Sequence, residues 1–281
     1  MSWMNRRRAL HLLIGGLGAA GCAGIYALEI EPHWVEVVRR ILPIKNLPEK
    51  LNGASLVQLS DLHVGLHVEE DYILDVFEKV RGMNPDIVAY TGDLVTHHSQ
   101  ILDQFRSIYL RMPKGKRATV LVLGNHDYGA AWSQHDQAVE YARFLEKQDV
   151  WVLRNKVVDV DGLQVAGLDD LWAGRFMPDL AFSRLVTRRP MIALTHNPDT
   201  VDSSGWRPFK GWILAGHTHG GQFKPPFLAP PRLPVRNRRY TSGAFELSGE
   251  RRMYINRGIG YLHKARFNVR PEITLFELRP V

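Results

Sequence analysis

Aspartate, asparagine and histidine residues stand in this sequence directly after runs of apolar residues. Each apolar run is long enough for a β-strand, and each ends in a short polar group. The five polar groups are Asp61-Leu62-His63, Gly92-Asp93, Asn125-His126-Asp127, His196-Asn197 and His217-Thr218-His219. Because the carboxyl ends of strands in an open α/β sheet converge on one crevice, these groups indicate a single shared site.

Taken singly, each group has an ordinary structural interpretation. An aspartate after a strand often caps a helix, a Gly-Asp pair makes a turn, and a lone histidine is often a core residue with satisfied hydrogen bonds. Five such groups together favour a metal site. Cys22 is the only cysteine, so the metal ligands must be nitrogen and oxygen atoms.

The chemistry that this ligand set suits is phosphoryl transfer. Mn²⁺, Fe²⁺ and Zn²⁺ accept carboxylate, amide oxygen and imidazole ligands together. Two such ions about 3.5–4 Å apart need a bridging carboxylate, and they hold both the attacking and the leaving oxygen of an in-line displacement. Two Asp, one Asn and four His would fill two sites of this kind.

The elements that must position these residues alternate along the first half of the chain. Strands are expected over residues 54–60, 86–91 and 119–123, each followed by a helix, over residues 69–81, 101–111 and 134–148. Further strands are expected at 150–153, 157–160, 163–166, 191–194, 212–215, 244–247, 252–255 and 273–277. This order predicts an α/β sandwich with more than one sheet.

The polar groups, written DLH, GD, GNHD, H and GHTH, resemble in content and order the signature blocks of the calcineurin-like metallophosphoesterases. The resemblance covers about residues 51–281 and implies a catalytic domain with a four-layer α/β/β/α sandwich. The RRR leader and the segments EPHW, DLWAG, THNPD, GHTHGGQ, RYTSG and NRGIG are similar to bacterial exported phosphodiesterases of the YaeI/YkuE type.

This resemblance implies a role for each matching residue. Two divalent metal ions, Mn, Zn or Fe, would be cofactors, with Asp93 as the bridging ligand. The remaining ligands would be Asp61, His63 and His219 for one ion, and Asn125, His196 and His217 for the other. His126 would stabilise the phosphate or protonate the leaving oxygen, and Asp127 would orient the His126 imidazole. A hydroxide bridging the two ions would attack phosphorus directly.

Substrate contacts are predicted from charge and position. Between residues 222 and 270 the chain carries eleven Lys or Arg and two Glu, which favours an anionic partner over a merely solvated surface. Arg257 follows a strand and would contact a phosphate, as would Arg236 in a Pro-rich loop and Asn197 beside a ligand. A surface arginine in a turn is the alternative for Arg257. His67 and His97 would line the cleft.

The N-terminus is typical of a targeting segment. Residues 1–28 place three arginines before twenty residues without formal charge, and the arginines resemble a twin-arginine export signal. Cys22 lies in a weak lipoprotein-like site, with a small helical residue as the alternative. Residues 29–50 have apolar residues near helical spacing, so we expect an amphipathic connecting segment that lies on a membrane or packs on the body.

We therefore expect an exported or inner-membrane-associated phosphodiesterase on the extracytoplasmic face of the bacterial envelope. Its substrate would be a phosphoester, on a lipid-linked carrier such as UDP-2,3-diacylglucosamine or, alternatively, a small soluble molecule. A non-catalytic metal-binding adaptor at the membrane is the alternative from another class. Nucleic acid is disfavoured as a partner, because aromatic and basic residues do not alternate outside one loop. The sequence makes no prediction of oligomeric state.

Overall fold

The computed structural model describes residues 6–65, 67–96 and 102–281, and within them the strands form two six-stranded sheets. The first sheet has the order β1 (Glu36–Ile44), β12 (Glu272–Pro280), β2 (Ser55–Leu59), β3 (Ile87–Thr91), β4 (Ala118–Val122) and β5 (Trp151–Val152). The second has the order β10 (Gly243–Leu247), β11 (Arg251–Ile255), β9 (Gly211–Ala215), β8 (Met191–Leu194), β7 (Leu163–Gly167) and β6 (Lys156–Val160). Both sheets are mixed, because parallel central strands carry antiparallel partners.

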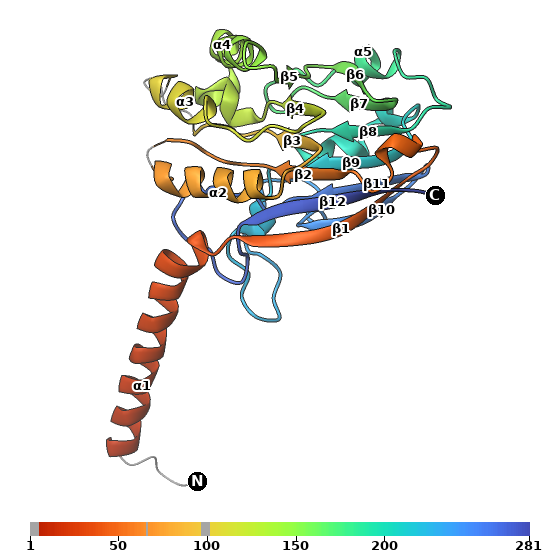
Figure 1. Ribbon diagram of the computed structural model, residues 1–281. Coiled ribbons are helices and arrows are strands. Elements are labelled where there is room, and N and C mark those ends of the chain that lie inside the picture. The colour runs from red at the N-terminus through yellow and green to blue at the C-terminus, as the bar shows by residue number, and fades with distance from the viewer. Residues whose placement is uncertain (1–5, 66, 97–101) are drawn as a thin grey trace.

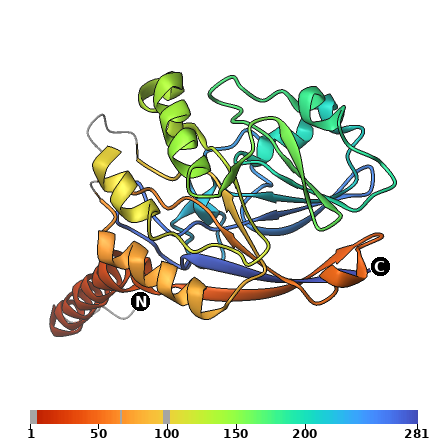
Figure 2. The same cartoon turned by 45° about the horizontal axis from the view of Figure 1, so that its top comes forward.

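Three hydrophobic clusters arrange these elements in four layers. The helices are α1 (Arg6–Ile25), α2 (Glu70–Gly82), α3 (Leu102–Tyr109), α4 (His135–Glu146) and α5 (Pro178–Phe182). One cluster joins the two sheets, a second lies under α2, α3 and α4, and a third lies under α5. Figures 1 and 2 show α2, α3 and α4 on one side of the paired sheets and α5 on the other. The predicted α/β/β/α sandwich is confirmed.

Helix α2 illustrates how local sequence specifies these layers. Ile73, Phe77 and Val80 recur at helical spacing and are fully buried against the first sheet. Glu70 in the first turn and Arg81 in the last turn carry the charges that the helix dipole favours at each end. The strands expected in the sequence are all present, with ends that differ by no more than three residues.

Residues 29–50 correct one expectation, because they contain strand β1 in place of an amphipathic helical segment. Strand β1 runs parallel to β12 along its whole length, with Glu36 opposite Glu272. The segment is rich in Val and Ile, which pack well in a sheet, and Pro43 is tolerated because β1 is an edge strand. The hydrogen bonds with the distant strand β12 therefore decided the conformation of this segment, although its apolar residues recur near helical spacing. The segment packs on the body of the protein.

The N-terminal segment is helical from Arg6, and α1 projects away from the sheets (Figure 1). In the part of the chain that the structure describes, no helix combines the length and apolar character needed to cross a membrane. Residues 1–5, at the start of the predicted targeting segment, lie outside the described residues.

Two adjacent residues of β1 test its place in the sheet. Leu42 is fully buried between the sheets, whereas Ile41 is 64% exposed. We expect Leu42→Ala to lower the free energy of unfolding by about 2–5 kcal/mol, because it leaves a cavity in the core. Ile41→Ala, the matched control, should change it by about 0.5 kcal/mol or less. Urea unfolding measures both, and equal losses would contradict this register.

Candidate metal centre

All seven predicted ligands lie at the carboxyl ends of central strands and are buried. The first sheet presents Asp61 and His63 after β2, Asp93 after β3 and Asn125 after β4, and the second presents His196 after β8 and His217 and His219 after β9. Because both sheets bring these strand ends to one edge, residues far apart in sequence come together there.

One cluster consists of Asp61, His63 and His219, whose ligand atoms all lie within 4.8 Å of one another. The Nε2 atoms of His63 and His219 are 3.1 Å apart, and His219 Nε2 lies 3.3 Å from Asp61 Oδ1. Burial lowers the pKa of His63 to about 3 and that of His219 well below its ordinary value, so both imidazoles are neutral. Neutral imidazoles converging with a carboxylate form a ready set of metal ligands.

The second cluster consists of Asp93, His196 and His217. His196 Nδ1 donates to the carbonyl of Thr91 at 2.8 Å, and His217 Nε2 donates to the carbonyl of Pro234 at 2.7 Å. These bonds fix both tautomers, because a carbonyl oxygen only accepts. If both rings were neutral, His196 Nε2 and His217 Nδ1 would therefore face each other as lone pairs, and these two atoms are 3.0 Å apart.

A positive charge is strongly favoured between these lone pairs. Burial opposes a charge on His196, but the carboxylate of Asp93, 3.1 Å from His196 Nε2, outweighs it and raises the pKa of His196 to about 10. Burial lowers the pKa of His217 to about 3. A divalent ion would replace the proton on His196 and satisfy both nitrogens and the carboxylate at once.

Asp93 lies between the two clusters. The same oxygen, Oδ2, is 3.1 Å from His196 Nε2 and 3.6 Å from His63 Nε2, as a bridging ligand requires. Burial alone would raise its pKa, yet the nearby imidazoles, His196 foremost, hold the pKa of Asp93 well below its usual range. Its carboxylate is therefore ionised.

Asn125 supplies a further donor. Its side chain is fully buried, and neither Oδ1 nor Nδ2 has a hydrogen-bond partner in the described part of the chain. A buried amide without partners is costly unless an ion or water satisfies it. The orphaned amide and the two ligand clusters fit two divalent ions, and these residue types do not select one metal.

The backbone at the ligands is held in an unusual conformation. Asp61, His63, Asp93, His217 and His219 all have φ between 50° and 70°, the left-handed region that residues with a side chain seldom adopt. The His217 N–H donates to both carboxylate oxygens of Asp61, at 3.1 and 3.0 Å, which ties the end of β9 to the end of β2. Such strain typically marks a functional site.

Gly124 and Gly216 permit close contact around the ligands. A Cβ atom on Gly124 would lie 2.3 Å from Asp93 Oδ1, and one on Gly216 would lie 1.9 Å from Ser60 Oγ. The Ser60 hydroxyl donates to Asp61 Oδ2 at 2.6 Å, a contact that the sequence did not indicate. Both glycines are therefore needed for the carboxylates to keep their positions.

His126 and Asp127 both lie beside the loops that carry the ligands. The His126 ring is half-buried, 5.0 Å from the His63 ring, and its backbone N–H donates to Asp93 Oδ1 at 2.9 Å. Asp127 accepts backbone N–H bonds from Gly124, at 2.8 Å, and from Leu94, at 2.8 Å. Asp127 thus joins two ligand-bearing loops, and its role in orienting the His126 imidazole stays a prediction.

The structure does not support the three predicted substrate contacts. Arg257 is paired with Glu272, at 2.5 Å, and with Glu36, at 2.9 Å, so its charge is neutralised inside the protein. Asn197 is buried, and its Oδ1 accepts from the backbone N–H of Asp199 at 2.9 Å, as a helix cap does. Arg236 is exposed in its loop but does not line the cavity at the metal centre.

A cavity of about 750 Å³ opens above both clusters, and His126 is among its lining residues. Its other walls were not predicted: they include Trp132, Trp172, Phe223, Arg232 and Arg238. The two tryptophan rings lie 4.5 Å apart, and Trp172 meets the His217 ring edge-on at 4.4 Å. Trp172 belongs to the DLWAG segment, the one signal in the sequence for this wall. His67 does not line the cavity, and His97 lies outside the described residues.

Comparison with known proteins agrees with this geometry. Residues 54–221 match the family model described as calcineurin-like phosphoesterase, and this match spans more than half of the chain. The chain therefore belongs to the calcineurin-like phosphoesterases. With both Asp/His clusters intact, it is a metal-dependent phosphoesterase with a dinuclear centre.

Relatives share the family over nearly the whole chain. The metallophosphoesterase YkuE of Bacillus subtilis is 32% identical over 99% of each chain, and the phosphodiesterase YaeI of Escherichia coli is 29% identical over 98% of this chain and 99% of YaeI. The UDP-2,3-diacylglucosamine pyrophosphatase LpxG of Chlamydia trachomatis is 27% identical over 92% of this chain and 94% of LpxG. The likeness extends well beyond the ligand residues.

The close contact at Gly124 generates a test of the metal centre. We expect Gly124→Ala to weaken metal affinity about 10- to 100-fold, because the new methyl group displaces Asp93. Gly82→Ala is the matched control, since a Cβ there would meet no atom within 4 Å. Elemental analysis of metal-reconstituted protein measures both, with Asp93→Asn as a variant that removes the bridging charge. Native metal content in Gly124→Ala would contradict this geometry.

Proposed function

We propose that the chain is a phosphodiesterase that cleaves a phosphoric ester or anhydride bond in a lipid-linked substrate, such as a UDP-2,3-diacylglucosamine-type pyrophosphate. The observation that carries this proposal is the composition of the cavity. Trp132, Trp172 and Phe223 supply apolar surface beside the ligands, and Arg232 and Arg238 supply positive charge. An amphiphile with a phosphate headgroup matches both.

The chemistry divides between the metal centre and the residues around it. Two divalent ions held there would neutralise phosphate charge and activate a water for attack. His126, on the cavity wall, would donate a proton to the leaving oxygen. Its loop is fixed by the bond from its own N–H to Asp93, so proton donor and ligand keep a constant spacing.

Two relatives support this class of reaction. YaeI is named as a phosphodiesterase, and LpxG as a pyrophosphatase that acts on a diacylated nucleotide sugar. A general phosphodiesterase for small soluble substrates is the second candidate, because Arg232 and Arg238 at the cavity would attract a phosphate whether or not it is joined to a lipid. The complete ligand set argues against a non-catalytic adaptor.

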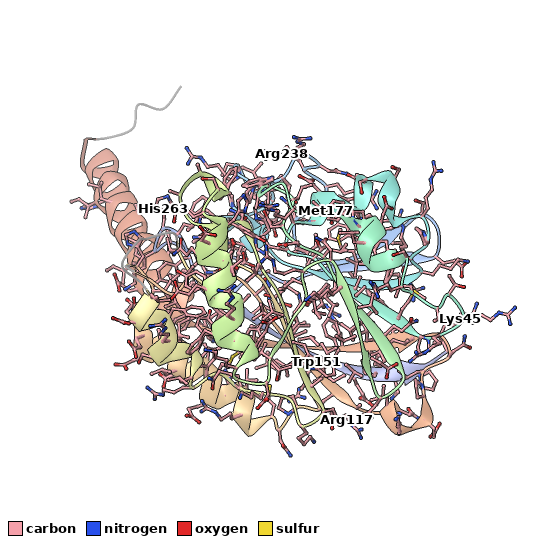
Figure 3. The ribbon with its side chains drawn as sticks, turned by 90° about the horizontal axis from the view of Figure 1, so that it is seen from above. Lys45, Arg117, Trp151, Met177, Arg238 and His263 are labelled. Atoms are coloured by element: carbon pink, nitrogen blue, oxygen red, sulfur yellow. The ribbon has the colours of Figure 1, made fainter. Side chains whose placement is uncertain are left out.

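A substrate panel separates the two candidates. We expect detergent-dispersed UDP-2,3-diacylglucosamine to be hydrolysed with a higher kcat/KM than bis(p-nitrophenyl) phosphate or a cyclic nucleotide. Of these substrates, only the diacyl compound has acyl chains that can pack against the apolar residues of the cavity wall. Trp132→Ala should raise KM for the diacyl substrate about tenfold and leave kcat unchanged. Trp151→Ala is the matched control, because Trp151 is exposed and does not line the cavity, and Figure 3 shows it well away from Arg238. A preference for small soluble diesters would rule out the lipid-linked substrate.

His126→Ala tests the proton donor separately from the metal ligands. We expect native metal content, because the imidazole is not a ligand, with kcat lower by about a hundredfold or more. Elemental analysis and steady-state kinetics on the same sample measure both. Full turnover in this variant would show that another group supplies the proton.

The location of the protein is a further proposal. The targeting segment over residues 1–28 supports export, with retention on the extracytoplasmic face of the inner membrane. Fractionation of bacteria that express the full chain tests this, and recovery in the cytoplasm alone would contradict it.

A further inference from the structure

Residues 223–233, here called the rim loop, carry an unusually exposed apolar tip. Phe227 is fully exposed, Leu228 is 63% exposed and Phe223 is 43% exposed. Exposure of large apolar side chains to water is unfavourable, and clusters of them on a surface mark sites that contact a partner or a membrane. In Figure 1 this loop, coloured between cyan and blue, hangs below the sheets on the side from which α1 projects.

The stretch of sequence that contains the rim loop carries charged side chains of one sign only. Residues 220–245 contain no Asp or Glu and five cations, Lys224, Arg232, Arg236, Arg238 and Arg239. Apolar side chains at a tip with basic residues behind them match the two layers of an anionic bilayer, the acyl chains and the headgroups. A protein partner would need its own acidic and apolar surface arranged in the same order.

The base of the rim loop is fixed to the segment that follows Ala265. The rings of Phe223 and Phe267 stack with centroids 5.3 Å apart. Two backbone bonds of 2.9 Å join the segments, from Lys224 N–H to the Phe267 carbonyl and from Phe267 N–H to the Gln222 carbonyl. The loop therefore projects from a rigid base while its tip remains exposed.

The same segment, which follows Ala265, also contacts the residues that connect α1 to the body of the protein. Arg266 N–H donates to the Ala27 carbonyl at 2.9 Å, and the Tyr26 ring meets the Phe267 ring edge-on at 6.2 Å. Glu31 accepts the backbone N–H of Asn268 at 2.8 Å. Helix α1, with apolar residues such as Leu17 and Ile25 exposed, is thereby held at a constant position relative to the rim loop.

The rim loop also forms a wall of the catalytic cavity. Phe223, Arg232 and Pro234, at and just beyond its two ends, line the cavity above the metal ligands. The carbonyl of Pro234 also orients His217. Figure 3 shows His263 near α1 and Arg238 along the top, both at the cavity, and Arg117 and Trp151 in the lower half of the view.

We propose that the rim loop inserts Phe227 and Leu228 into an anionic bilayer beside α1, so that the cavity mouth opens at the lipid surface. A lipid-borne phosphoester then reaches the metal centre without leaving the membrane. The route for the substrate rests on the proposed lipid-linked substrate, whereas the membrane contact itself does not.

Vesicle binding of the full chain tests the contact. We expect it to bind vesicles of phosphatidylcholine doped with phosphatidylglycerol, and Phe227→Ser with Leu228→Ser to weaken this partitioning about tenfold. The matched control is Leu180→Ser with Val186→Ser, two exposed apolar residues on and just after α5, which Figure 1 places on the other side. This control should bind as the native chain does, and pure phosphatidylcholine should bind more weakly because it lacks the attracting charge.

Hydrolysis of soluble bis(p-nitrophenyl) phosphate separates this proposal from the proposed function. The rim-loop variant should keep native activity on that diester, because neither side chain lines the cavity. Native vesicle binding by the rim-loop variant, or an equal loss in the control, would overturn the proposal while the enzyme assay still succeeds. Self-association through the rim loop in sedimentation, without vesicle binding, would likewise overturn it in favour of a protein interface. If the native chain hydrolysed neither this diester nor the diacyl substrate, that result would instead overturn the proposed function.

Discussion

The position of the Asp93 carboxylate is the constraint on which the site depends. One of its oxygens lies between an imidazole of each ligand cluster, and the other accepts the backbone N–H of His126. A buried carboxylate is costly unless positive charge and hydrogen bonds surround it. The neighbouring imidazoles meet that need together with the ions they would hold. Ligands, proton donor and charge are thus coupled through one side chain.

Holding that carboxylate in place requires both sheets and a strained backbone. Ligands from β2, β3 and β4 meet ligands from β8 and β9 only because the sheets pack face to face over a common apolar core. Left-handed backbone at five ligands costs stability, which the packed strands behind them supply. The rigid sandwich therefore does what flexible loops alone could not: it maintains ligand spacing to within the tolerance of a metal site.

The cavity at the metal centre, the rim loop and the start of the body after α1 are connected through direct contacts. Phe223 and Arg232 of the rim loop line the cavity, and the base of the rim loop contacts the segment to which the residues after α1 are bonded. Residues 265–269 therefore join the N-terminal segment to the rim loop, which lines the cavity mouth. Binding at a lipid surface and hydrolysis would then take place on the same edge of the molecule.

The sequence by itself determined the identity of the ligands, their order, the strands that carry them and the family. This was possible because each ligand directly follows an apolar run, so the relevant information is local. Only the tertiary structure decided that residues 36–44 pair as a strand with β12, that Arg257 is neutralised by Glu36 and Glu272, and that Trp132 meets Trp172. Strand pairing, ion pairs and ring contacts of this kind join residues far apart in the chain. The interaction energy of each contact depends on which residue the fold brings near, and the spacing of residues along the chain does not identify that residue.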